Sequence, residues 1–281
     1  MSILCLRGRR FGPGDFAIMA VVNRTPDSFY DQGRTYGFDA ALAAVDAAVA
    51  GGADIVDIGG VKAGPGDHVG PAEEIRRVAG LVEAVRDRHP GLVISVDTYR
   101  AEVGEIVAKA GADLLNDTWG GVDPRLAEVA AEYGTGLVCA HAGRVTPRTR
   151  PHRIAYDDIV SDVVSLTVGL AERAVRAGVP RESVLIDPAH DFGKNTWHSL
   201  AVSRRLHELT GTGWPVLVAV SNKDFVGETL GGLPVGERHA GTMATLAVSA
   251  WQGARVFRVH DAASTREALD AVSLLRKSSV S

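Results

Sequence analysis

Eight short runs of aliphatic and β-branched residues recur along the chain, each followed by a longer amphipathic stretch. The runs lie at residues 16–22, 54–58, 93–96, 114–115, 136–140, 184–186, 216–220 and 256–259. They are continuous rather than alternating, which is the pattern of strands buried on both faces of a parallel sheet. Helical periodicity follows them at 38–50, 71–88, up to 110, and at 124–133, 157–177, 196–209, 237–251 and 265–275.

These eight strand–helix units predict an α/β fold, a (β/α)8 TIM barrel. A doubly wound open sheet is the alternative, but such sheets seldom contain eight regular units. No Pro/Ser-rich linker or composition break divides the chain, so we expect a single domain over residues 1–281. Residues 1–15 precede the first unit and are expected to form a short N-terminal hairpin that turns at Gly12-Pro13-Gly14.

A polar residue ends nearly every predicted strand. Because active sites of this barrel lie at the carboxyl ends of the strands, we expect these side chains to meet at one mouth. The set consists of Asn23, Asp57, Asp97, Asn116, His141, Asp187, Ser221, Lys223, Arg258 and His260. Any single member could instead be a cap or an ion-pair partner, and for Arg258 the alternative is an ion pair with Asp261 or another mouth acid.

The mouth offers groups for a flat heterocycle. Carboxylates, an amide and an ammonium suit the N–H and carbonyl edges of such a ring. These groups come from Asp97, Asn116, Asp187 and Lys223. Phe192 is placed to cover a ring face. A second, more cationic group on neighbouring strands suits an anion such as a phosphate. It consists of Asn23, Arg258 and His260.

Composition narrows the class of partner. The formal net charge of −4 gives no case for binding nucleic acid or a membrane surface. No apolar run approaches the ~20 residues that a membrane span needs, and the brief run before Arg7 lacks the form of a secretory signal. Cys5 and Cys139 have no spacing typical of a metal site or a disulfide framework. We therefore expect a cytoplasmic protein with a small-molecule partner.

Motifs along nearly the whole chain resemble, in order, those of dihydropteroate synthase. They are Asn23-Arg24-Thr25-Pro26-Asp27-Ser28-Phe29, Gly52-Ala53-Asp54-Ile55-Val56-Asp57-Ile58-Gly59-Gly60, Ser95-Val96-Asp97-Thr98, Asn116-Asp117, Asp187-Pro188 with Phe192-Gly193-Lys194, Ser221-Asn222-Lys223-Asp224-Phe225, and Arg258-Val259-His260-Asp261. The resemblance implies a barrel, usually a homodimer, that condenses a dihydropterin pyrophosphate with p-aminobenzoate and releases pyrophosphate.

The resemblance also implies residue roles. The pterin pocket would consist of Asp97, Asn116, Asp187, Phe192 and Lys223, with Asp97, Asp187 and Lys223 as catalytic residues. Pyrophosphate would bind Asn23, Arg258 and His260, and Asn23 would hold Mg²⁺. Carboxylates, above all Asp97, would stabilise the pterin carbocation that the aromatic amine attacks. A first loop would close over the site. It contains Thr25, Asp27, Ser28 and Phe29.

The chain departs from the family's pattern around the second substrate. Where the family has Glu-Ser-Thr-Arg-Pro-Gly, this chain has Val61-Lys62-Ala63-Gly64-Pro65-Gly66, so the Thr–Arg pair of a second loop is missing. Asn222 replaces an arginine, which removes a further cation. Ala189 and Asp191 replace two glycines, which strains that loop if these positions need a positive φ.

The sequence therefore predicts a homologue that keeps the pterin pocket but is weak or inactive as a synthase. It would still bind flat p-aminobenzoate analogues of the sulfa or sulfone type. An active dihydropteroate synthase of folate biosynthesis is the first alternative, and a non-catalytic dimer partner is the second. Another pterin enzyme, such as a methyltetrahydrofolate methyltransferase, is the third. The pyrophosphate residues argue against it, because methyl transfer needs no diphosphate site.

Overall fold

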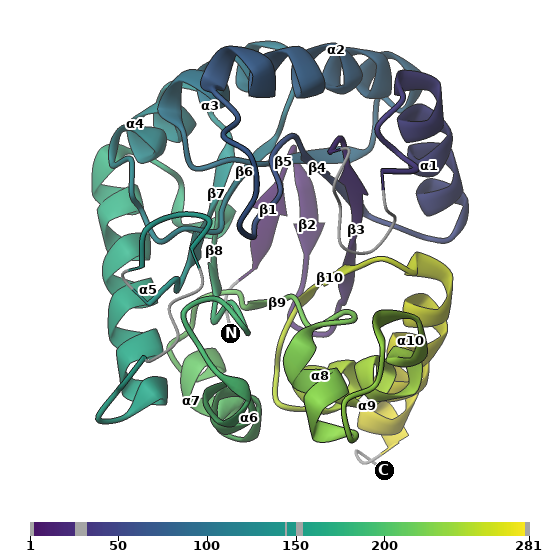
Figure 1. The fold of residues 1–281 in the computed structure, drawn as a ribbon, viewed down its shortest axis with the longest axis vertical. Coiled ribbons are helices and arrows are strands. Elements are labelled where there is room, and N and C mark those ends of the chain that lie inside the picture. Colours follow the sequence, from purple (N-terminus) through teal and green to yellow (C-terminus); the bar gives the residue numbers. More distant parts are fainter. Residues whose placement is uncertain (1–2, 26–32, 144, 150–153, 279–281) are drawn as a thin grey trace.

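The computed structural model describes residues 3–25, 33–143, 145–149 and 154–278, and within them eight parallel strands form one sheet. The strands are β3 (Ala17–Asn23), β4 (Ile55–Gly59), β5 (Val93–Asp97), β6 (Leu114–Asp117), β7 (Gly136–Ala140), β8 (Val184–Asp187), β9 (Leu217–Val218) and β10 (Val256–Val259). They pair in the order β8-β7-β6-β5-β4-β3-β10-β9. The two edges meet where the amide of Ile186 donates to the carbonyl of Pro215 at 3.0 Å. The sheet therefore curls into a nearly closed barrel, which confirms the predicted fold (Figure 1).

Helices surround the barrel (Figure 1). They are α1 (Phe38–Ala50), α2 (Pro71–Arg88), α3 (Ala101–Lys109), α4 (Arg125–Tyr133), α5 (Ile159–Ala177), α6 (Thr196–Arg204), α7 (Leu206–Thr210), α8 (Asp224–Thr229), α9 (His239–Trp251) and α10 (Ala262–Ser278). The first two match the predicted bounds, because a glycine precedes each of them and α1 also ends at Gly51-Gly52. Among the described helices, none has both the length and the apolar composition that crossing a membrane requires.

Apart from shifts of up to three residues at helix ends, as in α10, three elements differ from the prediction. The helix expected at 196–209 is divided into α6 and α7 by Arg205, whose φ and ψ are −108° and 24°. Helix α8 was not predicted, because six residues are too few to display helical periodicity. All of 216–220 is buried, but only Leu217–Val218 pairs as strand β9. A continuous apolar run indicates burial and does not separate a paired strand from a buried extended segment.

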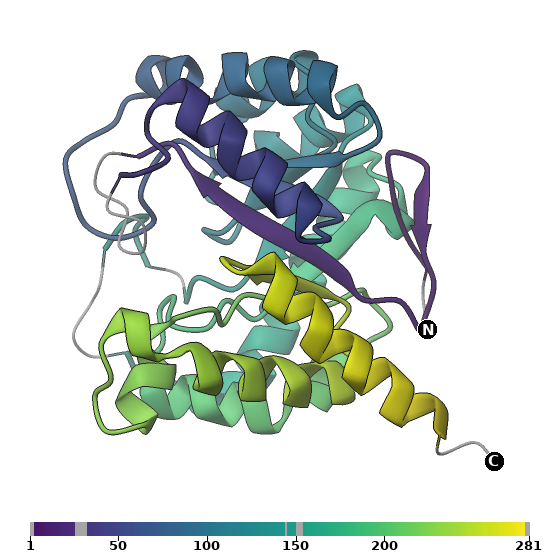
Figure 2. The same ribbon diagram turned by 90° about the vertical axis from the view of Figure 1, so that its right-hand side faces the viewer.

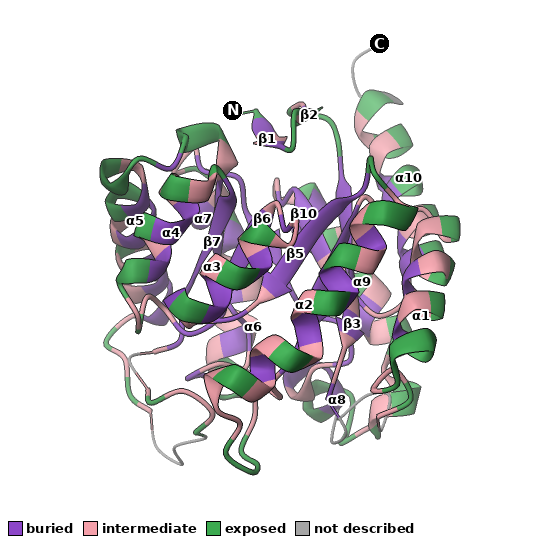
Figure 3. Cartoon of the chain, turned by 90° about the horizontal axis from the view of Figure 1, so that it is seen from above, coloured by how far each residue is buried: buried purple, intermediate pink, exposed green. Residues whose placement is uncertain are grey.

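The strands are buried on both faces, and their alternate side chains fill two apolar layers. Side chains that point outward, such as Ile18, Ile94 and Val96, pack against the helices. Side chains that point inward, such as Met19 and Leu114, fill the barrel. Figure 3 shows the same division, with buried strands inside and helices whose exposed faces point to solvent. This double burial explains the continuous apolar runs in the sequence.

The N-terminal hairpin consists of β1 (Leu4–Leu6) and β2 (Arg9–Phe11), which pair antiparallel. Its turn is Arg7-Gly8, and both residues have positive φ, at 49° and 70°. Two-residue hairpin turns favour such values because they match the twist of the strands. The predicted turn at Gly12-Pro13-Gly14 is therefore wrong, since that segment follows the hairpin and leads into β3.

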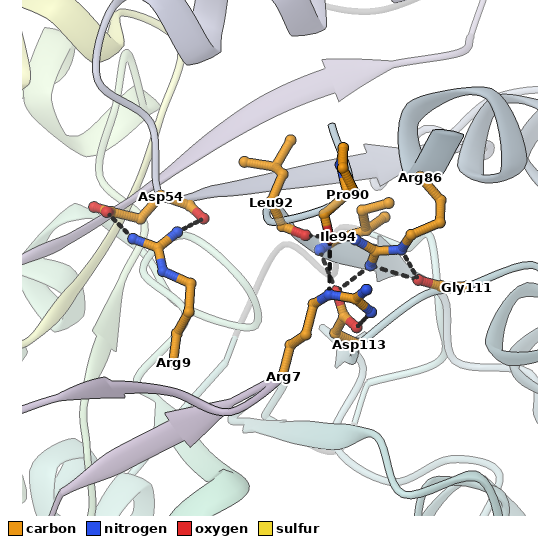
Figure 4. A network of polar contacts seen from close by, with 9 residues as sticks. All are labelled: Arg7, Arg9, Asp54, Arg86, Pro90, Leu92, Ile94, Gly111 and Asp113. Carbon is orange, nitrogen blue, oxygen red and sulfur yellow. Dashed lines mark hydrogen bonds and ion pairs between the residues drawn. The ribbon is translucent and has the colours of Figure 1, made fainter. Parts of the chain in front are cut away.

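The hairpin covers the end of the barrel where the strands begin (Figure 2). Leu4 is buried among inward-facing strand residues. Arg7 donates to Asp113 at 3.2 Å and Arg9 donates to Asp54 at 2.8 Å, and each acid directly precedes a strand (Figure 4). Because active sites of this fold lie at the opposite end, the hairpin contributes stability rather than catalytic groups.

Candidate functional site

Four predicted mouth residues form one hydrogen-bonded cluster at the carboxyl ends of the strands. Arg258 donates from Nε to Asp57 at 2.6 Å and from Nη2 to Asp97 at 3.0 Å. Asn116 Nδ2 donates to Asp57 at 3.1 Å, and the hydroxyl of Ser95 donates to the same carboxylate at 2.6 Å. The prediction that these strand ends meet is confirmed. The partners of Arg258 are therefore two acids of the mouth, and not Asp261. This agrees with the alternative that Arg258 forms an ion pair with a mouth acid.

Asn116 is oriented by this cluster and leaves one polar atom without a partner. The Asp57 carboxylate only accepts hydrogen bonds, so the Asn116 amide must present its NH₂ group to it. The other atom, Oδ1, is buried and has no hydrogen-bond partner in the described part of the chain. A buried acceptor of this kind costs free energy unless a ligand supplies a donor. Asn116 therefore indicates a place for a ligand N–H group.

Asp97 lies opposite Asn116 in the register of β5 and β6. Burial raises the pKa of its carboxyl to about 7, while the charge of Arg258 lowers it and that of Asp57 raises it again. The hydroxyl of Thr118 donates to Asp97 at 3.2 Å. The carboxyl therefore exchanges its proton near neutral pH, and a ligand that brings positive charge or N–H donors favours its ionised form.

Asp187 and Lys223 are the other two charged residues of the predicted pterin pocket. Burial raises the pKa of Asp187, and the charge of Lys223 opposes this shift. Asp187 Oδ1 accepts the amide N–H of Ala189 at 2.7 Å. The Lys223 ammonium donates to the carbonyl of His190 and lies 4.8 Å from the ring centroid of Phe192. Hydrogen bonds to the protein thus hold the side chains of Asp187 and Lys223 in place before any ligand binds.

Phe192 is held at the mouth by two contacts. One ring face lies under the Lys223 ammonium, and the ring packs edge-to-face on Trp119 with centroids 5.2 Å apart. Sequence reasoning did not single out Trp119. Its position two residues after the strand end Asn116-Asp117 could have identified it as a residue of the mouth.

The loop between β8 and α6 needs left-handed backbone at both positions where glycines are replaced. Ala189 has φ 47° and Asp191 has φ 68°, which confirms the prediction made for these two residues. Such a conformation costs roughly 1–2 kcal/mol for an alanine, and less for an aspartate that hydrogen-bonds locally. Asp191 accepts the hydroxyl of Ser199 at 3.2 Å and the amide N–H of Phe225 at 3.3 Å.

A buried ammonium, that of Lys194, holds this loop in place. It donates to the carbonyls of Ala189 and Phe192 at 3.1 Å and 3.0 Å, and to Nδ1 of His141 at 2.7 Å. His141 Nε2 pairs with Asp162 at 2.7 Å. Burial and the charge of Lys194 lower the pKa of His141 to about 4. His141 is therefore neutral and positions the loop, a role that its place at a strand end did not indicate.

The predicted pyrophosphate residues adjoin the pterin residues rather than forming a separate site. Arg258 already bonds Asp97, as described above. A Cβ at Gly59 would lie 3.3 Å from Asn23 Oδ1 and 3.8 Å from the Cβ of Asp97. Glycine at this position therefore keeps the space between Asn23 and Asp97 open.

The third pyrophosphate residue, His260, lies at the end of β10, where its Nδ1 is 3.0 Å from the hydroxyl of Ser221. Of the residues that the structure describes, no three His, Cys, Asp or Glu side chains are grouped as a protein metal site would need. Asn23 instead offers a single amide oxygen. This donor set fits Mg²⁺, which commonly takes one or two protein oxygens and completes its shell with phosphate and water.

The second loop borders a narrow cleft beside Asp97, with a volume of about 10 Å³, which is room for about one water molecule. The cleft is lined by Val61, Lys62, Ala63, Glu74, Asp97, Thr98, Tyr99, Trp119 and Arg148. The family's loop arginine is missing from this chain, but Lys62 of the same loop still lines the cleft.

Arg148 was not predicted as a site residue, yet it brings a guanidinium to the same cleft. It belongs to the segment between β7 and α5 and donates to the carbonyls of Lys62, Gly64 and Asp67 at 3.2, 3.4 and 2.7 Å. These contacts cross more than eighty positions in the sequence, so no local pattern could show them. Arg148 therefore connects the second loop to the segment between β7 and α5.

Two further predictions concern the rim. Thr25 of the first loop is buried, whereas Asp27, Ser28 and Phe29 lie outside the described residues. Asn222, which replaces an arginine, has φ 57° and is buried, and its amide N–H donates to Thr242 at 3.1 Å. Its side chain brings no charge to the rim.

Comparisons with known proteins identify relatives of the chain. The profile described as "Pterin binding enzyme" matches residues 19–260. "Inactive dihydropteroate synthase 2" of Mycobacterium tuberculosis is 57% identical over 268 residues, which cover 94% of this chain and 84% of that protein. The Mycobacterium leprae protein of the same name is 53% identical over 279 residues, covering 98% and 95%. The crystal structure of Yersinia pestis dihydropteroate synthase with a sulfonamide drug complex has a TM-score of 0.92 at 35% identity, covering 98% of this chain and 99% of that one.

Proposed function

Because the chain belongs to the family of pterin-binding enzymes that includes dihydropteroate synthase, we propose that it keeps a pterin pocket but condenses dihydropterin pyrophosphate with p-aminobenzoate weakly or not at all. One observation carries the first half of this proposal. The buried Oδ1 of Asn116 has no partner in the described chain, and Asn116 lies opposite an acid, Asp97, in the register of β5 and β6. An aminopyrimidine edge supplies the N–H donors that both groups need.

The charge of each proposed pterin residue determines which group of the ring it would bind. They are Asp97, Asn116, Asp187, Phe192 and Lys223. Carboxylates accept from the amino and ring N–H groups, and Lys223 donates to the ring carbonyl or a ring nitrogen. We assign catalysis to Asp97, Asp187 and Lys223. The two carboxylates would stabilise the positive charge that develops as pyrophosphate leaves, and Lys223 would hold the ring in register.

The second half of the proposal, low synthase activity, rests on the anion contacts. Pyrophosphate is assigned to Asn23, Arg258 and His260, but Arg258 already bonds two carboxylates at 2.6 Å and 3.0 Å. The positions of the second-loop arginine and of the Ser-Arg-Lys arginine carry Gly64 and Asn222. Two missing charge-assisted contacts at ~1.5–3 kcal/mol each would slow turnover by orders of magnitude. The mycobacterial relatives, which are named inactive dihydropteroate synthases, support this expectation.

Ligands and cofactor follow from the same site. Asn23 is the residue that we expect to hold Mg²⁺, which would neutralise a bound diphosphate. Flat p-aminobenzoate analogues of the sulfa type are the second ligand class, which the sulfonamide complex of the Yersinia pestis relative supports.

The assembly is part of the proposal. We expect a homodimer through α9 and α10, where Val248, Trp251, Leu274 and Leu275 are more than half exposed. Arg276 reaches the carbonyl of Ala250 at 3.4 Å, which brings the carboxyl ends of the two helices together. Exposed apolar side chains gathered in this way are typical of an interface. We also expect one domain, since the hairpin packs on the barrel interior, and a cytoplasmic location, since both cysteines are unpaired thiols.

An active synthase is the second candidate, and Arg148 is the observation that favours it. Its guanidinium lines the cleft beside Asp97, where the family's loop arginine is missing. Arg148 would then supply the anion contact from another loop.

A restored second loop tests the proposal. The double variant Ala63→Thr with Gly64→Arg returns the family's residues, so pyrophosphate release with both substrates should rise at least tenfold over the natural protein. Arg148→Gln separates the two candidates. If natural turnover is already ordinary and falls in Arg148→Gln, the active synthase is correct. If the double variant stays as slow as the natural chain, the second loop is not the cause.

A further inference from the structure

Arg24 directly follows strand β3, and its guanidinium contains two buried nitrogens without a partner. The atoms Nε and Nη1 are shielded from solvent and form no hydrogen bond within the described part of the chain. The backbone holds the residue in place, because the amide N–H of Arg24 donates to the carbonyl of Gly59 at 2.7 Å. Buried N–H groups of this kind cost free energy unless an acceptor reaches them. Arg24 therefore indicates a place for an acceptor that the described residues do not supply.

Two aromatic rings lie next to the Arg24 guanidinium. Its Cζ is 6.0 Å from the ring centroid of Tyr36 and 5.7 Å from that of Phe38. The hydroxyl of Thr35 donates to the carbonyl of Asn23 at 2.6 Å, which holds this segment against the end of β3. Rings attract a guanidinium through its charge, but they supply no oxygen acceptor for its N–H groups. The rings therefore position Arg24 and leave Nε and Nη1 unsatisfied.

A second arginine, Arg77 of α2, contacts the same ring. Its Cζ is 5.8 Å from the ring centroid of Tyr36, and its Nη1 donates to the carbonyl of Gly60 at 2.9 Å. Arg24 and Arg77 thus share one ring and are bonded to consecutive carbonyls, those of Gly59 and Gly60. Both cations therefore lie where the first and second loops begin.

Acidic side chains compensate only part of this positive charge. Arg76 and Arg77 both pair with Glu73, each at 2.7 Å. The adjacent acid of the helix pairs with Arg100 instead. Among the described residues, the group of Arg24, Arg76 and Arg77 therefore has one paired carboxylate for three guanidinium groups. This surplus suits a phosphate group, whose charge is roughly −1.5 to −2 at pH 7.

We propose that Arg24 binds the oxyanion of a phosphate group where the first and second loops begin. A guanidinium suits this ligand, because its fixed planar donors form charge-assisted hydrogen bonds to phosphate oxygens. Two sources share this chemistry, namely inorganic phosphate and the diphosphate of a pterin ester. The site does not depend on the proposed pterin function, since none of the residues assigned to the pterin ring takes part in it.

Calorimetry with inorganic phosphate in Mg²⁺-free buffer tests the site. The natural protein should bind phosphate saturably, and Arg24→Gln should bind it at least tenfold more weakly, because glutamine has the amide donor but no charge. Arg76→Gln is the matched control. It removes an equal charge from a largely exposed side chain of the same group, so its affinity should stay within threefold of the natural value.

A second variant covers the case in which Arg24→Gln does not fold. Arg24→Lys keeps the charge and loses the planar donors, so it should bind phosphate about three- to tenfold more weakly than the natural protein. Phosphate that does not bind the natural protein, an unchanged affinity in the Arg24 variants, or an equal loss in Arg76→Gln overturns the inference.

His260→Asn locates the bound phosphate, because His260 is assigned to pyrophosphate at the mouth. A loss of phosphate affinity in His260→Asn without a loss in Arg24→Gln would place the anion at the mouth and overturn the inference.

Titrations of hydroxymethylpterin and its diphosphate ester identify the source of the phosphate group. If Arg24→Gln weakens the ester as well as inorganic phosphate, and leaves the free pterin within threefold, the group is the diphosphate of the ester. If the ester is unaffected, the phosphate is a separate ligand. If neither pterin binds the natural protein, the proposed function falls, and the titration of inorganic phosphate still decides the role of Arg24.

Discussion

At the scale of single residues, the mouth combines buried carboxylates with one unpartnered amide oxygen. Asp57 orients Asn116 and also anchors Arg258 at 2.6 Å, so one acid sets the direction of two side chains. Asp97 shares the same arginine but keeps a pKa near neutrality. The binding properties of the mouth therefore depend on which of these groups a ligand completes.

Replacing Asn116 tests its assignment to the ligand. Asn116→Leu removes the acceptor Oδ1 and should weaken free pterin binding by tenfold or more, since a hydrogen bond to a buried group contributes roughly 1–3 kcal/mol. The matched control is Ser95→Ala, which removes another donor to Asp57 but no group assigned to the ligand. Calorimetry that gives equal losses for both variants would assign Asn116 a structural role.

The pH dependence of pterin binding reports on Asp97. Its carboxyl has a raised pKa of about 7 in the folded protein, so it is ionised and able to accept ligand N–H groups only above that pH. Affinity for the free pterin should rise from about pH 6 to about pH 8. Asp97→Asn should bind more weakly with a smaller slope, and the remaining slope belongs to Asp187, whose pKa burial also raises.

The same shift acts on folding with the opposite sign. Between the unfolded pKa of 3.8 and the folded value of about 7, the folded state holds a proton that the unfolded state has lost. The Asp97 contribution to the free energy of unfolding therefore falls as pH rises through this window. Urea titrations should show this decline in the natural protein and less of it in Asp97→Asn. An equal decline in both would assign it to other groups.

The sequence predicts which residues meet at the mouth, because strand ends of a parallel barrel share one rim. It gives an ion pair of Arg258 with a mouth acid as an alternative, but it cannot say that the partners are Asp57 and Asp97, since that depends on distances across the barrel. Nor can it predict the contact of Arg148 with Gly64, since the two lie far apart in the chain.

At the scale of elements, the loops rather than the strands distinguish this chain. The second loop is held by Arg148, and the loop after β8 is held by Lys194 through carbonyls at 3.0–3.1 Å. Both cations act on backbone groups, so they fix loop shape without depending on the identity of the loop side chains.

Removing the Arg148 guanidinium should release the second loop. Arg148→Ala loses the hydrogen bonds to the carbonyls of Lys62, Gly64 and Asp67, each contributing about 1 kcal/mol. Amide hydrogen exchange across residues 61–67 should accelerate at least tenfold, with little change in the barrel strands. Arg148→Lys keeps the charge but loses the forked geometry of the guanidinium. Its exchange rate across residues 61–67 should lie between those of the natural protein and Arg148→Ala. Unchanged exchange in Arg148→Ala would show that other contacts hold this loop.

Element prediction succeeds where periodicity is long and fails where burial comes from tertiary contacts. The bounds of α1 and α2 agree with the sequence pattern, while α8 is too short to show one. The hairpin turn depends on the backbone conformation of Arg7-Gly8, whereas Gly12-Pro13-Gly14 has the stronger local composition.

At the scale of the whole molecule, contacts that stabilise the fold and residues assigned to the ligand lie at opposite ends of the barrel. The hairpin (Figure 2) and the ion pairs of Asp54 and Asp113 (Figure 4) lie at the end where the strands begin. The mouth residues follow the carboxyl ends of the strands. This division is the reason why the loops at the mouth can change while the fold remains the same.

A substitution in the hairpin tests this separation. Leu6→Ala deletes a buried side chain beneath the barrel and should lower the free energy of unfolding by about 2–5 kcal/mol. Urea denaturation measures this loss. Affinity for the free pterin should stay within threefold of the natural value at temperatures where the variant is folded. A large loss of affinity would show that the two ends of the barrel are coupled.

The central claim is a pterin pocket without effective synthesis. The most direct measurement combines, on one preparation with Mg²⁺ present, calorimetric binding of the free pterin with an assay of pyrophosphate release at saturating pterin pyrophosphate and p-aminobenzoate. Saturable pterin binding with turnover at least a hundredfold below that of the Yersinia pestis relative, assayed alongside, is the predicted result. Turnover equal to that enzyme, or no pterin binding at all, would contradict it.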